Sequence, residues 1–240
     1  MANYYIADLH LGHANVIRFD NRPFADLNEM HNTILDNWNK TVTGNDTVYI
    51  LGDMIWAKES EWLFWLGPLA GKKVLITGNH DPKQFSAATK KFFQDIKDYK
   101  DIADNGRRVL LCHYAMPFHM AAYSENCYML YGHVHNTREY TFLEKFRKEI
   151  KESCSEQGHA KGNFINVGCM MPWMDYTPRT LDEIIEREAR WHEENPRRFL
   201  SGCLKITGKS ESTTRLRPVW NGCLPEKGLR QRRSTEAAVR

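Results

Sequence analysis

The stretch that decides the fold is KVLITGNHD, residues 73–81. Its first half is a short apolar run rich in β-forming residues, which predicts a buried strand from Lys73 to Thr77. Its second half, Gly78-Asn79-His80-Asp81, is a turn that carries an amide, an imidazole and a carboxylate. Sheets gather functional side chains at the carboxyl ends of their strands, so the turn is expected to carry chemistry.

Four other blocks show polar ligands after a β-forming run. They are Asp8-Leu9-His10, Gly52-Asp53, His113 and Gly132-His133-Val134-His135. The runs before them predict strands over residues 3–7, 47–51, 108–112 and 128–131. Because a sheet can bring such blocks to one edge, they are expected to form a single site. The set holds enough donors for two metal ions, which favours hydrolysis of a phosphate ester.

Helical patterns alternate with these strands. Asp26 is a plausible N-cap, Glu29 follows three residues later, and an apolar stripe continues to Trp38. Thr180 and Glu183 repeat this pattern before an amphipathic helix to Trp191. Other helices are expected over 56–69, 85–93 and 140–158, a loop over 11–25, and further strands over 163–167, 204–206 and 216–220. Alternation of strand and helix through the first half predicts an α/β fold.

Charge divides the chain into a body over residues 1–200 and a tail over 201–240. The tail holds nine lysines and arginines against three acids, a net charge of +6, whereas the whole chain carries +3 and the body therefore −3. A basic terminus can be a solvated, partly disordered segment. It can also hold RNA or DNA near the site, so nucleic acid is an open partner.

Six cysteines occur without any C-x-x-C pair, which argues against a zinc knuckle or a redox motif. Cys112 and Cys169 lie in or beside apolar runs and are expected to be small core residues. The start of the chain lacks the pattern of a secretory signal, and no stretch has membrane-spanning length. A soluble protein of the reducing cytoplasm is the expectation.

Imidazole, carboxylate and amide ligands together suit manganese, iron, zinc, nickel or cobalt better than calcium. Asp53 is the natural bridge between two such ions, and a metal-bound hydroxide would be the nucleophile. If Asn79 binds a metal, His80 is free to face the substrate and protonate the leaving oxygen. Asp81 is then expected to accept a hydrogen bond from the His80 ring and so hold its orientation.

These five blocks, in this order, resemble the calcineurin-like metallophosphoesterase family. The resemblance runs from Asp8 to His135, a little over half of the chain. An early loop around Arg22-Pro23-Phe24 and the turn Asn166-Val167-Gly168 look like the compact bacterial and phage-type branch of that family. The region after Trp191 shows no resemblance.

The resemblance implies a fold, a ligand set and an activity. The fold would be a four-layer αββα sandwich of two mixed sheets flanked by helices. The first metal would be held by Asp8, His10, Asp53 and His135, and the second by Asp53, Asn79, His113 and His133. His80 matches the catalytic histidine. The activity would be that of a metal-dependent phosphoesterase, with a phosphodiesterase favoured over a phosphomonoesterase and manganese as the favoured ion.

Several alternatives stay open. The fold can also serve as a non-catalytic scaffold, although all the ligand positions and His80 are filled here. A nuclease would draw its support from the basic tail. Arg18 and Arg22 can clamp a substrate phosphate or form surface ion pairs, with equal weight. The substrate, whether a small phosphate ester or a nucleotide, and the oligomeric state are not determined by the sequence.

Overall fold

Two four-stranded sheets form the framework of the computed structural model, which describes residues 1–153 and 159–196. The strands of the first sheet are β1 (Asn3–Ile6), β2 (Thr47–Leu51), β3 (Lys72–Ile76) and β4 (Phe93–Lys97), paired in that order and parallel throughout. Those of the second are β5 (Tyr99–Asp104), β6 (Arg107–Cys112), β7 (Cys127–Tyr131) and β8 (Phe164–Asn166). In the second sheet β5 is antiparallel to β6, whereas β6, β7 and β8 run parallel.

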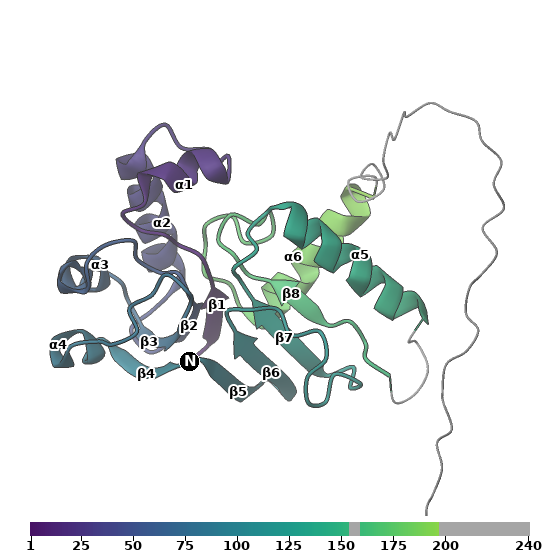
Figure 1. Ribbon diagram of the computed structural model, residues 1–240. Coiled ribbons are helices and arrows are strands. Elements are labelled where there is room, and N and C mark those ends of the chain that lie inside the picture. The colour runs from purple at the N-terminus through teal and green to yellow at the C-terminus, as the bar shows by residue number, and fades with distance from the viewer. Residues whose placement is uncertain (154–158, 197–240) are drawn as a thin grey trace, which may run out of the picture. The chain divides into compact units, whose positions relative to one another are not determined.

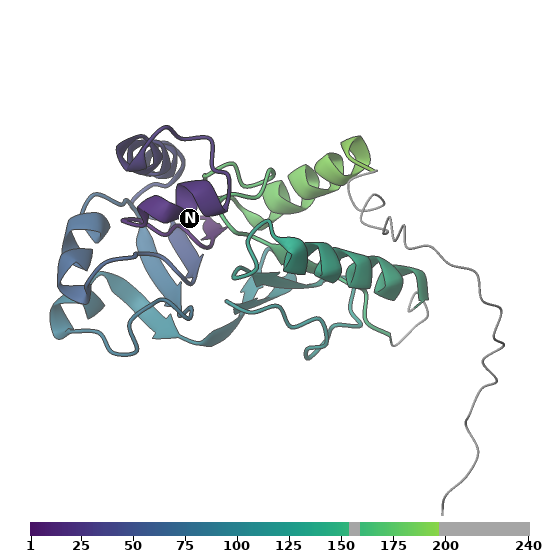
Figure 2. The same ribbon diagram turned by 45° about the horizontal axis from the view of Figure 1, so that its top comes forward.

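Helices accompany both sheets (Figures 1 and 2). They are α1 (Ala14–Phe19), α2 (Leu27–Thr41), α3 (Trp62–Leu66), α4 (Ala87–Lys90), α5 (Arg138–Ser153) and α6 (Leu181–Glu194), with a 3-10 turn η1 (Glu59–Glu61) before α3. In both views α1 to α4 lie around the first sheet, and α5 and α6 lie next to each other beside the second. The predicted α/β fold with two sheets and flanking helices is confirmed. One detail differs, because the first sheet is parallel rather than mixed.

The two sheets meet along β1 and the segment after β8. Ala7, just past β1, forms a parallel bridge with Gly168, and its N–H donates to the carbonyl of Val167 at 2.8 Å. The N–H of Cys169 returns a bond of 2.8 Å to the carbonyl of Ala7. This contact brings the carboxyl end of β1 next to that of β8, so loops from both sheets can contribute to one site.

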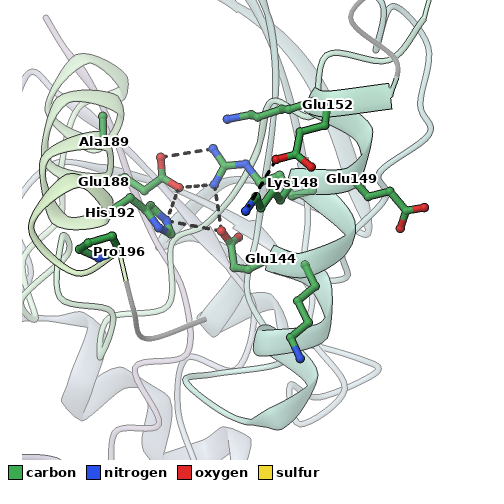
Figure 3. A pocket seen from close by; sticks show the side chains of 11 residues that line it. Glu144, Lys148, Glu149, Glu152, Glu188, Ala189, His192 and Pro196 are labelled. Carbon is green, nitrogen blue, oxygen red and sulfur yellow. Dashed lines mark hydrogen bonds and ion pairs between the residues drawn. The ribbon is translucent and has the colours of Figure 1, made fainter. Parts of the chain in front are cut away.

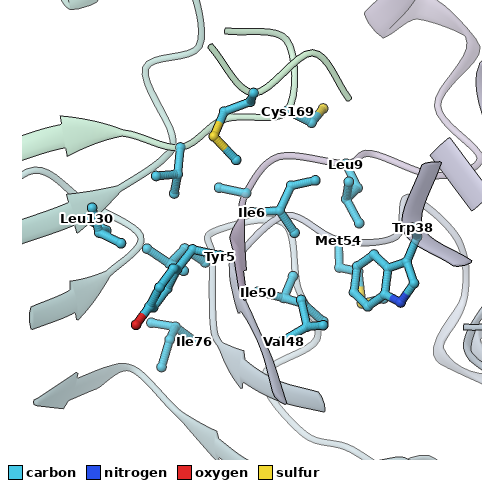
Figure 4. Packing of buried hydrophobic residues seen from close by; sticks show 14 of the residues in the cluster. Tyr5, Ile6, Leu9, Trp38, Val48, Ile50, Met54, Ile76, Leu130 and Cys169 are labelled. Carbon is cyan, nitrogen blue, oxygen red and sulfur yellow. The ribbon is translucent and has the colours of Figure 1, made fainter. Parts of the chain in front are cut away.

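A continuous apolar core fills the space between the layers (Figure 4). Tyr5 and Ile6 from β1 pack there with Leu130 from β7, and Trp38 from α2 is fully buried. The core also contains Cys169, which is fully buried, and Cys112 is buried in a smaller cluster, as expected from their apolar neighbours. Such burial is the main favourable term that holds the loops above the strands in place.

Two helix starts confirm the capping patterns. The Asp26 carboxylate accepts the N–H of Glu29 at 2.9 Å, and α2 begins at the next residue, Leu27. Thr180 and Glu183 form a complete capping box before α6. The Thr180 hydroxyl accepts the backbone N–H of Glu183, and the Glu183 carboxylate accepts the backbone N–H of Thr180.

Three sequence predictions need correction. The loop over 11–25 contains α1. The helix expected over 56–69 is limited to α3 with its 3-10 turn, because the chain at Ile55 and Trp56 pairs with Leu11 in a parallel β-bridge. The helix expected over 85–93 shrinks to α4, and β4 and β5 follow it. These two strands hold few apolar residues, so their pairing comes from tertiary context.

The boundary at residue 200, the late strands over 204–206 and 216–220, and the basic tail lie outside the described residues and stay predictions. The same holds for Cys154, Cys203 and Cys223. Within residues 1–153 and 159–196, no helix is long and apolar enough to cross a membrane.

Candidate metal centre

The predicted ligands lie together where five strands end. Ligand atoms of Asp8, His10 and His135 lie within 4.8 Å of one another, and we call these residues the first ligand group. Ligand atoms of Asp53, His113 and His133 meet the same limit and form the second ligand group. Asn79 belongs with the second group, since its Oδ1 lies 3.0 Å from Nε2 of His113. All seven predicted ligands are therefore assembled from β1, β2, β3, β6 and β7.

Asp53 stands between the two groups. Its Oδ2 lies 3.8 Å from Nε2 of His10 in the first group and 3.5 Å from Nε2 of His113 in the second. Its Oδ1 accepts the backbone N–H of His80 at 2.9 Å. One oxygen thus faces both groups while the other is held by the turn, which is the arrangement that a bridging carboxylate requires.

Hydrogen bonds outside the groups set the orientation of two histidine rings. Nδ1 of His113 lies 2.8 Å from the carbonyl oxygen of Leu51, and Nδ1 of His135 lies 2.7 Å from Oδ1 of Asp20. Both partners only accept, so each Nδ1 carries a proton and each Nε2 points into the centre. There, Nε2 of His113 faces Oδ1 of Asn79 and Oδ2 of Asp53, both acceptors. Such a cluster of inward acceptors fits a bound cation.

The electrostatics of the buried groups agree with this fit. Burial raises the pKa of Asp8 to about 6 and lowers that of His10 to about 3. Burial opposes the charged forms of Asp53 and His113 too, but their mutual hydrogen bond and attraction bring the pKa of Asp53 to about 2 and raise that of His113 to about 9. The second group therefore stabilises positive charge. Without metal, a proton on His113 supplies this charge, and a divalent ion would take the place of that proton.

Two glycines permit the close approach of the loops. A Cβ at Gly78 would overlap Oδ1 of Asp53 and lie 2.7 Å from its backbone nitrogen. A Cβ at Gly132 would lie 2.6 Å from Oδ2 of Asp8. Any larger residue at either position would push a carboxylate out of its group, which explains why these blocks are marked by glycine.

The ligand backbones adopt an uncommon conformation. Five of the seven predicted ligands have φ values between 47° and 70°, in the left-handed region that non-glycine residues rarely adopt: Asp8, His10, Asp53, His133 and His135. Such residues cluster at functional sites, where the surrounding structure holds them against a cost of about 1–3 kcal/mol each. The folded core therefore imposes the geometry of the centre.

Asp81 has a different partner from the one expected. Its carboxylate accepts three backbone N–H groups, from Gly78 at 2.8 Å, Asp53 at 3.0 Å and Met54 at 3.0 Å, rather than the ring of His80. It fastens the turn after β3 to the turn after β2. The residue still supports the centre, but it positions Asp53 and not His80.

Arg22 also differs from the expectation of a phosphate clamp. Its guanidinium is buried and donates to the carbonyls of Leu9 (3.0 Å) and Asp8 (2.9 Å) and to Oδ2 of Asp20 (2.9 and 3.0 Å). These bonds turn it away from any substrate. Arg22 instead holds Asp20, which orients His135. Asp20 follows no strand and matches no motif, so only its place in the fold reveals it.

The chain of contacts through Asp20 yields a prediction. Asp20→Ala is expected to lower the affinity for manganese by about 10- to 100-fold, because it removes the carboxylate that fixes the His135 ring. Calorimetric titration of metal-stripped protein would measure this. Asp36→Ala, which alters an exposed carboxylate of α2, is the control and should bind manganese as the wild type does. Equal affinity in the two variants would refute the role of Asp20.

Three further candidate side chains, those of His80, Arg18 and Tyr114, lie outside the two ligand groups. His80 is exposed, and its ring centroid lies 4.5 Å from that of Trp56. Arg18 is exposed, with its guanidinium 5.5 Å from the Phe19 ring centroid, so it remains our candidate for contact with a phosphate. Tyr114 is 46% exposed and packs edge-on against His133.

A third acidic cluster lies between α5 and α6 (Figure 3). Arg147 binds the carboxylates of Glu144 and Glu188, and His192 lies 3.1 Å from Glu188. In this cluster the Arg147 guanidinium already supplies the positive charge that balances the carboxylates. In the two ligand groups, by contrast, acceptor atoms face one another. We therefore assign this cluster to fastening the two helices, and a cavity of about 660 Å³ lies beside it.

A family model described as the calcineurin-like phosphoesterase superfamily domain matches residues 1–181. The chain belongs to this family. The matched region contains both ligand groups, Asn79 and His80, so the phosphoesterase domain carries the whole candidate metal centre.

Relatives of this phosphoesterase domain come from archaea, bacteria and phages. The uncharacterized protein MJ1445 of Methanocaldococcus jannaschii is 36% identical over 62% of this chain and 80% of its own length. The Gene 66 protein of Mycobacterium phage L5 is 37% identical over 32% of this chain, which spans only 39% of the phage protein. The crystal structure of AQ665 of Aquifex aeolicus, a protein of unknown function, aligns with a TM-score of 0.55 at 30% identity, covering 77% of this chain and 97% of that one. The phage relatives fit the compact branch indicated by the sequence.

Proposed function

We propose that the chain is a dinuclear metal-dependent phosphodiesterase. The observation that carries the proposal is the position of Asp53, whose Oδ2 faces His10 of the first ligand group and His113 of the second. A shared carboxylate offsets the repulsion between two cations held close together. The mixed nitrogen and oxygen donors favour manganese, with iron, zinc, nickel and cobalt as alternatives.

The first ion would be held by Asp8, His10, Asp53 and His135, and the second by Asp53, Asn79, His113 and His133. When bound, such ions supply a water of lowered pKa as nucleophile and neutralise phosphate oxygens. His10 is neutral, because burial lowers its pKa to about 3, so its lone pair is available for coordination. His113 would lose its proton when it coordinates.

The His80 side chain lies outside both ligand groups. Its backbone N–H is tied to Asp53, while its ring is exposed at the edge of the centre. From there it would protonate the leaving oxygen of the ester or stabilise the charge that develops on it. Because Asn79 turns towards His113, Asn79 would bind the metal while the adjacent His80 would contact the substrate.

A diester is the preferred substrate in this proposal. A monoester carries a second negative charge, and a clamping arginine would normally neutralise it. Arg22, which lies in the early loop, is turned inward and bonded to Asp20 and to backbone carbonyls. Arg18 alone of the two predicted arginines is exposed to meet a phosphate.

A turnover assay with metal-stripped protein tests the proposal. Manganese, nickel, zinc or magnesium would be added with bis-p-nitrophenyl phosphate and p-nitrophenyl phosphate in parallel. We expect manganese-dependent turnover that favours the diester and falls at least about 100-fold in His80→Ala, the usual range for a lost general acid. Metal analysis should give two ions per chain. No turnover of either ester, or undiminished turnover in His80→Ala, would contradict the mechanism, and one ion per chain would contradict the dinuclear centre.

A further inference from the structure

A line of aromatic rings leads outward from the candidate metal centre. The Trp56 ring lies 4.5 Å from that of His80, and the His13 ring stacks on Trp56 at 4.1 Å with an interplanar angle of 10°. Phe19, at the end of α1, meets His13 edge-on at 6.2 Å. We call Trp56, His13 and Phe19 the aromatic strip. None of the three belongs to either ligand group.

Two of the three rings, Trp56 and Phe19, are exposed although they are large, whereas His13 between them is half-buried. Trp56 is 42% exposed and Phe19 is 65% exposed. Exposed apolar rings beside a polar site gain free energy when a ligand covers them, and aromatic side chains are common at binding surfaces for this reason. The ligand groups and His80 account for the hydrolytic chemistry without the strip, so its role has to be sought in binding.

The backbone under Trp56 is anchored, so the ring is presented in a defined position. The N–H of Trp56 donates to the carbonyl of Leu11 at 2.7 Å, and Leu11 forms a parallel bridge with Ile55. Leu11 and Ile55 are both buried. Gly12 passes so close that a Cβ there would lie 2.9 Å from the carbonyl oxygen of Trp56. The two loops thus hold the indole beside His80 on a rigid support.

Space for a ligand continues beyond the strip. Phe19 lines a cavity of about 490 Å³ together with Asn21, Asn136 and Thr137. The side-chain amides and the hydroxyl offer both donors and acceptors, which suit the edge of a heterocycle. A flat aromatic surface next to such groups favours a planar, polar ring over an alkyl chain.

From these observations we propose that the aromatic strip binds the nucleobase of a nucleotide ester whose phosphate lies at the metal centre. Stacking needs a planar ring, and every base has a π-face to offer. Only a sugar separates base and phosphate in a nucleotide, and Trp56 is the direct neighbour of His80. This inference rests on the proposed function for the position of the phosphate, and it adds the class of substrate.

Equilibrium binding tests the inference without turnover. Calorimetry on manganese-loaded protein would compare AMP with ribose 5-phosphate, which has the same sugar and phosphate but no base. AMP is expected to bind at least about tenfold more tightly, within the range measured for base stacking on aromatic side chains. Trp56→Leu should weaken AMP binding by about tenfold and leave ribose 5-phosphate binding unchanged.

Two control variants separate stacking from general damage. Trp56→Phe keeps a ring and should retain most of the preference for AMP. Phe64→Leu removes an aromatic side chain of α3 that is 73% exposed and makes no ring contact with the strip among the described residues, so it should bind both ligands as the wild type does. Equal affinity of the wild type for AMP and ribose 5-phosphate would overturn the inference, as would an equal loss for both ligands in Trp56→Leu.

The outcomes also separate this inference from the proposed function. Turnover of phosphodiesters without any preference for AMP would overturn the base site alone. A preference for AMP that depends on Trp56, without turnover of any ester, would support the base site and contradict the hydrolase. Free nucleotides and nucleic acids share the same base chemistry, so a single-stranded oligoadenylate belongs in the same titration. If the oligoadenylate binds more tightly than AMP, the natural ligand is a nucleic acid. If the two bind equally, the natural ligand is a free nucleotide.

Discussion

Asp53→Ala is expected to lower kcat/KM for the favoured ester at least about a thousandfold. Stabilisation by bound metal ions is worth several kcal/mol, and each 1.36 kcal/mol is a factor of ten in rate. One oxygen of Asp53, Oδ2, faces histidines of both ligand groups, so the loss of this side chain should also reduce the metal content below two ions per chain. Steady-state kinetics and metal analysis on the same preparation would measure both effects.

Controls distinguish this effect from misfolding. Asp36→Ala removes an exposed carboxylate of α2 and should leave both quantities unchanged. The thermal unfolding of Asp53→Ala without metal should remain cooperative, since the core between the sheets does not depend on this side chain. Full activity with two bound ions in Asp53→Ala would disprove the bridging role.

Arg147→Met is expected to lower the free energy of unfolding by about 3–5 kcal/mol, the usual cost of removing one partner from a buried ion pair. Burial opposes the charge of Glu188, but Arg147 brings its pKa to about 2, and Glu144 beside it is buried as well. Without the guanidinium these two carboxylates would face each other between α5 and α6. Urea unfolding monitored by circular dichroism would give the change.

Lys148→Met is the matched control on the same helix. Lys148 pairs with Glu152 near the surface, where both side chains are more than 60% exposed, so its loss should cost less than about 1 kcal/mol. A similar, small change in both variants would show that the cluster does not fasten α6 to α5. Because the cluster lies outside the metal centre, Arg147→Met should keep its metal content under conditions where it is folded.

The convergence of the candidate ligands could be predicted from the sequence because each block is local. A glycine, a strand-like run and a polar residue occur within a few positions at Asp53 and at Asn79, and parallel strands bring such ends together. The supporting residues could not be predicted in this way. Asp20 and Asp81 act through hydrogen bonds to segments distant in sequence, and no local pattern indicates their partners.

The arrangement of the sheets shows the same limit. Strands β4 and β5 are separated by Asp98 alone, yet they belong to different sheets. Their sequences carry many charged residues, and the local signal for strands is weak. Only the pairing of β4 with β3 and of β5 with β6 decides their conformation.

The left-handed ligand backbones have a consequence for the choice of metal. Since the fold already holds Asp8, His10, Asp53, His133 and His135 in strained conformations, an incoming ion does not have to order them. A site preorganised in this way would bind an ion without a large entropic cost, and its strained backbone would resist widening to admit further donors. Such a site would suit ions that bind few nitrogen and oxygen ligands. It would not suit calcium, which binds six to eight oxygens. The strained loops would thereby favour ions of low coordination number.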